Sequence, residues 1–159
     1  MREKPFDDIT VSELVRRAGV GRTTFYAHYQ DPSDLLLDGF VGMLSWTTER
    51  LAAEPASTRR LLPVRELFEH VASARPMLAM FAESEQLPTL WRLAALHFAK
   101  SIEARVGGPL PARFAAGAMI ETLQWWLDQC DPPPAAEVDR DFHALLSARM
   151  RGPCMPRTN

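Results

Sequence analysis

Apolar residues recur along most of the chain at spacings of three and four, which is the period of an amphipathic helix. Glycine and proline separate these stretches, and no stretch alternates in the way expected of a half-buried strand. We therefore predict an all-α fold. The expected helices run over 11–18, 22–29, 32–53, 64–74, 77–83, 89–106, 112–130 and 137–151.

The first two expected helices are short and have well-defined ends. Thr10 and Glu13 have the spacing of a capping box, and Gly19 suits the left-handed position that closes a helix. Asp31 and Pro32 then provide an N-cap and a first helical residue for the longer third helix. Two short helices joined by Gly19-Val20-Gly21 have the geometry of a helix-turn-helix over Ile9–Leu36. We place the domain boundary near residue 40, with 1–40 as the helix-turn-helix domain and 41–159 as a second helical bundle.

The second short helix would present a small, polar face to solvent. At about 100° per residue, Phe25 and Tyr29 share the inward side of this helix. The outward positions hold side chains that fit a major groove and can bond base edges, thymine methyls or phosphates. The amides at the start of the first helix would offer a further phosphate site. The predicted DNA-binding residues are Thr10, Val11, Arg22, Thr23, Thr24, Tyr26, Ala27 and His28.

These residues also carry a family resemblance. The run from Phe6 to Tyr29, including Ala18-Gly19-Val20-Gly21-Arg22-Thr23-Thr24-Phe25-Tyr26, resembles the DNA-binding motif of the TetR (tetracycline repressor) family. The resemblance covers roughly Phe6 to Leu36 and implies a homodimeric regulator, more often a repressor, that reads a palindromic double-stranded DNA operator and responds to a small molecule. Two features differ from the family pattern. Most of the family's first helix has no counterpart before Phe6, and Pro32 stands where the family often has a lysine.

Charge neither supports nor excludes a nucleic-acid partner. The chain of 159 residues has a net charge of −2, whereas DNA-binding surfaces are usually basic. Residues 14–30, however, contain three arginines and one histidine and no acidic residue. A protein of the same helical class that binds a ligand or a partner but no longer binds DNA remains the alternative.

Other function classes find little support in the sequence. The two cysteines have no metal-binding spacing, and the four histidines are dispersed, so we predict no metal and no cofactor. No phosphate loop or nucleophile motif indicates an enzyme. Without a long apolar run or an apolar leader, we expect a cytoplasmic protein with no membrane partner.

The C-terminal helices contain two further candidate sites. The helix over 112–130 is apolar on more than one side, so we expect a second subunit to cover part of it. The predicted dimer interface is Ile120, Leu123, Trp126, Leu127, Phe142, Leu145 and Leu146. Large apolar groups with a few polar neighbours also suggest a pocket for an apolar or aromatic effector, although the same pattern fits ordinary core. The predicted effector-binding residues are Phe81, Trp91, His97, Met119, Glu121 and Trp125.

Overall fold

The computed structural model describes residues 5–53, 60–75, 78, 81 and 84–150, and every regular element in these ranges is helical. This confirms the predicted all-α fold. A short 3₁₀ helix, η1 (Phe6–Asp8), precedes the first α-helix. The α-helices are α1 (Val11–Ala18), α2 (Arg22–Tyr26), α3 (Pro32–Ala52), α4 (Val64–Ser73), α6 (Leu87–Val106), α7 (Pro109–Leu127) and α8 (Ala135–Met150).

The ends of α1 and the start of α3 are fixed by the capping residues that the sequence indicates. The Thr10 hydroxyl accepts a hydrogen bond from the Glu13 amide at 3.3 Å, and the Glu13 carboxylate accepts one from the Thr10 amide at 2.9 Å. Gly19 closes α1 with φ of +68°, which favours glycine. At α3, the Asp31 carboxylate accepts from the Asp34 amide at 3.0 Å, and Pro32 occupies the first turn. These three predicted boundaries are confirmed.

Other predicted boundaries were displaced. Helix α2 ends at Tyr26 rather than at residue 29, because the His28 amide donates to the Phe25 carbonyl and tightens the chain into a turn. Pro88 and Pro109 do not separate helices; each lies in the first turn of one, where its missing N–H has no helical partner to lose. The helix expected over 77–83 lies largely outside the described residues.

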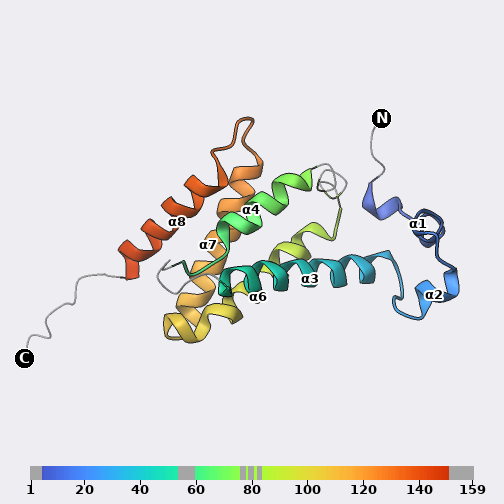
Figure 1. Cartoon of the computed structure of the whole chain (residues 1–159), viewed down its shortest axis with the longest axis horizontal. Helices are drawn as coiled ribbons and strands as arrows, with labels where there is room; N and C mark the ends of the chain where they lie inside the picture. Colours follow the sequence, from blue (N-terminus) through green and yellow to red (C-terminus); the bar gives the residue numbers. More distant parts are fainter. Residues whose placement is uncertain (1–4, 54–59, 76–77, 79–80, 82–83, 151–159) are drawn as a thin grey trace, which may run out of the picture.

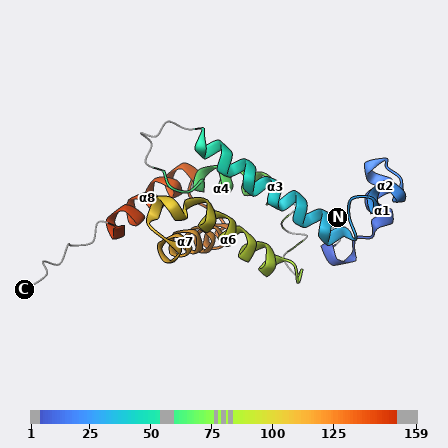
Figure 2. The same cartoon turned by 90° about the horizontal axis from the view of Figure 1, so that it is seen from below.

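Helix α3 connects the two parts of the molecule. It leaves the α1–α2 pair at one end of the elongated structure and runs alongside α4 and α6 (Figures 1 and 2). Its 21 residues span roughly 30 Å at 1.5 Å per residue. Helices α6 and α7 pack together, as do α4 and α8. The core between them is centred on fully buried side chains from four helices, namely Leu44, Leu67, Phe68, Phe98, Met119 and Leu123.

A buried ionic cluster joins the segment before α4 to α8. Nη2 of Arg60 lies 2.6 Å from the Glu66 carboxylate and 2.9 Å from the Asp139 carboxylate. His143 Nε2 accepts hydrogen bonds from the Leu61 and Leu62 amides, while its Nδ1 lies 2.7 Å from the Asp139 carbonyl. Burial raises the pKa of Glu66, but the hydrogen bond from Arg60, a backbone hydrogen bond and the charges of Arg60 and Arg65 together outweigh it, so the pKa is lowered overall. The ion pair therefore holds its charges at neutral pH.

Within the described residues, none of the helices combines the length and the apolar character needed to cross a membrane.

Candidate nucleic-acid interface and apolar pocket

Helix α2 presents a polar face to solvent, as its periodicity predicts. Phe25 is buried at 6 % exposure, and its ring packs edge-on against Tyr26 and at a tilt against Tyr29. Thr23, Thr24, Ala27 and His28 are exposed, and the Tyr26 side chain is 59 % exposed. The buried Phe25 thus fixes the rotation of the helix, and this rotation directs the small polar residues outward.

Arg22 and Thr10, two of the predicted DNA-binding residues, already have partners within the helix pair. The Arg22 guanidinium donates to the Ser12 hydroxyl on α1. The Thr10 hydroxyl serves the capping box, and the Glu13 carboxylate lies over the same helix end. A phosphate near Val11 would therefore meet a carboxylate as well as the remaining amides. Arg22 is better placed, because its long side chain is exposed at the start of α2.

Tyr29 links the end of α2 to α3. Its hydroxyl donates to the Asp38 carboxylate at 3.1 Å. The pKa of the Tyr29 phenol is raised, mainly by this hydrogen bond and next by the negative charge of Asp38. The sequence places Tyr29 on the inward side of α2. In the structure the side chain is half-exposed, and its hydroxyl forms a hydrogen bond to α3 rather than a fully buried core contact.

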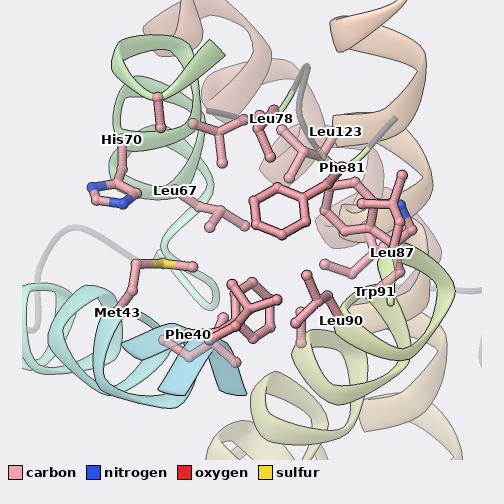
Figure 3. Close-up of a pocket in the computed structure, with 16 residues that line it drawn as sticks. Phe40, Met43, Leu67, His70, Leu78, Phe81, Leu87, Leu90, Trp91 and Leu123 are labelled. Atoms are coloured by element: carbon pink, nitrogen blue, oxygen red, sulfur yellow. The ribbon is translucent and has the colours of Figure 1, made fainter. Parts of the chain in front are cut away.

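An apolar pocket lies where α3, α4, α6 and α7 meet. Figure 3 shows Phe81 and Trp91 facing it, together with Phe40, Leu67 and Leu90. The cavity has a volume of about 60 Å³ and its lining is almost entirely hydrocarbon, with the His70 imidazole as a polar group. The other lining residues are Leu36, Met43, Leu44, Val71, Ala74, Leu78, Leu87, Ala94, Ile120 and Leu123. The contribution of α3 was not predicted from the sequence, although Leu36, Phe40 and Met43 follow a helical spacing that could have revealed it.

Four of the six predicted effector-binding residues lie elsewhere. His97 lines a polar surface hollow, where its Nε2 lies 3.2 Å from the Thr48 hydroxyl. Burial lowers the pKa of His97 and so favours the neutral ring. Met119 is fully buried in the core, and Glu121 is exposed on α7. Trp125 is 50 % exposed, and it faces a groove between α7 and α8. Only Phe81 and Trp91 of the predicted set line the apolar pocket.

The predicted dimer interface also requires correction. Ile120, Leu123 and Trp126 are buried in the subunit's own core, as are Phe142 and Leu146, and Leu127 is half-buried. A second subunit has little access to them. Among the described residues, the large apolar side chains that α7 and α8 leave exposed are instead Leu110, Phe114, Trp125 and Leu145. Of these, only Leu145 was predicted to lie in the interface. We call them the α7–α8 face.

Two contacts join η1 to the part of the chain that contains Phe81 of the pocket lining and Ser84. The rings of Phe6 and Phe81 stack at a tilt, with 4.7 Å between their centroids. The Ser84 hydroxyl donates to the Asp7 carboxylate at 2.8 Å. Phe6 and Asp7 belong to η1, directly before α1, whereas Phe81 lines the pocket. The pocket wall and the helix-turn-helix are therefore in direct contact.

The N-terminal region matches a known family. The family described as "Bacterial regulatory proteins, tetR family" matches residues 1–38, which include η1, α1, α2 and the start of α3. Residues 1–38 of this chain are therefore similar to the TetR family. The matched region contains the exposed face of α2 and the two η1 residues that contact Phe81 and Ser84.

Relatives and a solved structure are consistent with this assignment. The chain is 30 % identical over 102 residues to the HTH-type transcriptional regulator EthR of Mycobacterium tuberculosis (strain H37Rv), and equally to EthR of Mycobacterium bovis. The match covers 57 % of this chain, and the chain spans about half the length of these relatives (47 %). The crystal structure of a TetR transcriptional regulator from Streptococcus agalactiae 2603V superposes with a TM-score of 0.64, at 19 % identity, over 91 % of this chain and 85 % of that one. That likeness shows a shared fold.

Proposed function

We propose that this chain is a ligand-responsive transcriptional regulator of the TetR family. It acts as a repressor in the bacterial cytoplasm and binds a palindromic DNA operator as a homodimer. The observation that carries the proposal is the exposed face of α2, where Thr23, Thr24 and Tyr26 project from a helix fixed by the buried Phe25. Small polar side chains let a helix enter the major groove and bond base edges. The curated relatives are themselves named transcriptional regulators.

The α7–α8 face supports the homodimer. Phe114 and Trp125 are 61 % and 50 % exposed on α7, and Leu145 is 71 % exposed on α8. A β-carbon added at Gly117, which lies between the two aromatic residues on α7, would meet no atom within 4 Å, so a partner helix has room for close approach. Two helices from each subunit, related by a twofold axis, would bury these side chains in a four-helix interface.

Helix α3 and η1 support a mechanism of regulation by linkage. Helix α3 begins beside the helix-turn-helix and lines the apolar pocket through Leu36, Phe40 and Met43. A ligand that widens the pocket pushes on α3 and on Phe81, which contacts Phe6. Half-sites lie roughly 34–36 Å or a multiple apart, so a small rotation of each reader mismatches one of the two grooves. The ligand needs only to bind the mismatched dimer more tightly than the matched one.

A DNA-binding titration tests the proposal. The chain is titrated against DNA from upstream of its own gene and against a shuffled duplex of equal length and composition, at low and at physiological salt. We expect the upstream DNA to bind more tightly, and affinity for both duplexes to fall steeply as salt rises. Equal binding of the two duplexes, or no salt-sensitive binding at all, would overturn the DNA-binding part and favour a ligand-binding protein that does not recognise DNA.

A further inference from the structure

The guanidinium of Arg75 lies in an unusual environment beside the apolar pocket. Within the described part of the chain, its Nη2 is buried and has no hydrogen-bond partner. The guanidinium carbon lies 5.5 Å from the centre of the Trp126 ring. That ring is itself fixed, because the Trp126 indole N–H donates to the Pro133 carbonyl at 2.7 Å. Burial of an unpaired, charged N–H is costly, so this position favours an anionic partner.

Arg75 lines a hollow that adjoins the apolar pocket. The hollow has a volume of about 410 Å³, and Leu78, Leu87 and Trp91 line both it and the apolar pocket. Its polar groups come from Arg75, Gln124 and Asp128. The two cavities together therefore form one site with a hydrocarbon interior and a polar end that contains a cation.

We propose that the ligand of this site is an amphipathic carboxylate, whose hydrocarbon part enters the apolar pocket and whose carboxylate pairs with Arg75. This proposal rests on the proposed function only in treating the pocket as the ligand site. A planar carboxylate accepts two parallel N–H bonds from a guanidinium, and such charge-assisted pairs are the strong ones. A neutral or cationic amphiphile has no equivalent partner at Arg75.

Asp128 is the group that opposes an anion at this end. It lies on the rim of the same hollow and is exposed, so its charge is well screened by solvent. Arg75 is half-buried and packed on an aromatic face, where electrostatic interactions are stronger. The attraction of a carboxylate to Arg75 therefore exceeds its repulsion from Asp128. Asp128 is also a second position at which the proposal can be tested.

The experiment compares three probes with the same eight-carbon chain: octanoate, octan-1-ol and octylamine. Binding to the full chain is measured by calorimetry. We expect octanoate to bind at least about tenfold more tightly than either other probe. Arg75→Gln should bring octanoate within about twofold of octan-1-ol and leave the octan-1-ol affinity unchanged. Arg92→Gln, at an exposed arginine on α6, is the matched control and should retain the preference.

Asp128→Asn tests the same site without removing the buried cation. It should tighten octanoate by about two- to threefold and leave octan-1-ol unchanged, since only the anion is repelled. The proposal is overturned if octanoate binds no more tightly than octan-1-ol, if none of the probes binds, or if the preference survives Arg75→Gln. Operator binding is measured separately. An octanoate preference that depends on Arg75, without any effect on operator affinity, would support the ligand class and contradict the regulatory role.

Discussion

The rings of Phe6 and Phe81 are in contact, with 4.7 Å between their centroids, although 74 residues separate them in the sequence. Phe6 lies directly before the first helix of the helix-turn-helix, and Phe81 lines the apolar pocket. Aromatic pairs at this separation attract one another beyond the area that they bury. The contact therefore favours one orientation of the helix-turn-helix relative to the pocket wall.

Weakening the contact between Phe6 and Phe81 should reduce the effect of a ligand in the pocket on operator binding. We expect Phe6→Leu to reduce the change in operator affinity that octanoate causes. Phe6→Ala should lower the free energy of unfolding by about 3–5 kcal/mol, because Phe6 is buried. Operator titrations with and without octanoate, and urea unfolding, measure the two effects. Val41→Ala, at an exposed position on α3, is the control. An octanoate response as large in Phe6→Leu as in the wild type would contradict a role for the pair in coupling.

Thr24 is expected to contact a base edge. Thr24→Ala should weaken operator binding by about 1–3 kcal/mol and relax the preference at one base pair of each half-site. Gel-shift competition with operators altered at single positions measures both quantities. Thr89→Ala, at a partly exposed threonine on α6, should leave them unchanged. Unaltered affinity and preference in Thr24→Ala would remove Thr24 from the residues that read sequence.

A charge on the α7–α8 face should separate the subunits of the proposed dimer. We expect Trp125→Glu to weaken dimerisation by about 2 kcal/mol or more, which is roughly 30-fold in the dissociation constant, because large aromatic residues dominate interfaces. Sedimentation equilibrium gives this constant. Leu96→Glu introduces the same charge at an exposed leucine on α6 and should not affect assembly. Equal dissociation constants for the two variants would place the interface elsewhere.

The Glu66 carboxylate should make stability depend on pH in the acidic range. The pKa of Glu66 is lowered in the folded chain from its ordinary 4.5, so its stabilising contribution is present above that value and is lost as the pH falls through the folded pKa. Glu66→Gln should cost about 1.5–3 kcal/mol at pH 7 and progressively less below about pH 4.5. Urea unfolding at both pH values measures this. A cost that does not change with pH, or an equal cost for the exposed Glu69→Gln, would contradict it.

The helix-turn-helix was predictable because local chemistry determines it. Thr10 and Glu13 cap a helix through bonds three residues apart, and Gly19 closes it with a backbone conformation that few other residues adopt. Asp31 starts α3 in the same local way. None of these contacts depends on the rest of the fold, so residue identity and spacing alone were sufficient.

The second domain was less predictable, because several of its helices are apolar on more than one side. Helix α7 has Ile120, Leu123 and Trp126 on one side and Phe114 and Trp125 on another, and the sequence does not show which side faces the core. On α6, the helical period already indicates that two of the predicted effector-binding residues lie on different sides of the helix. Trp91 and His97 are six residues apart, which at 3.6 residues per turn places them roughly 120° apart around the helix. They were therefore unlikely candidates for one pocket, and the structure separates them.

The small size of the apolar cavity has a consequence for sensitivity to the ligand. About 60 Å³ holds only a few carbon atoms, so a larger ligand binds only those molecules in which the lining has opened. The apparent dissociation constant is then the intrinsic one divided by the open fraction, and roughly one open molecule in a hundred weakens binding roughly a hundredfold. In the proposed regulator, the threshold concentration for the response is thus set by how rarely the cavity opens, and selection can adjust it through packing residues that never touch DNA.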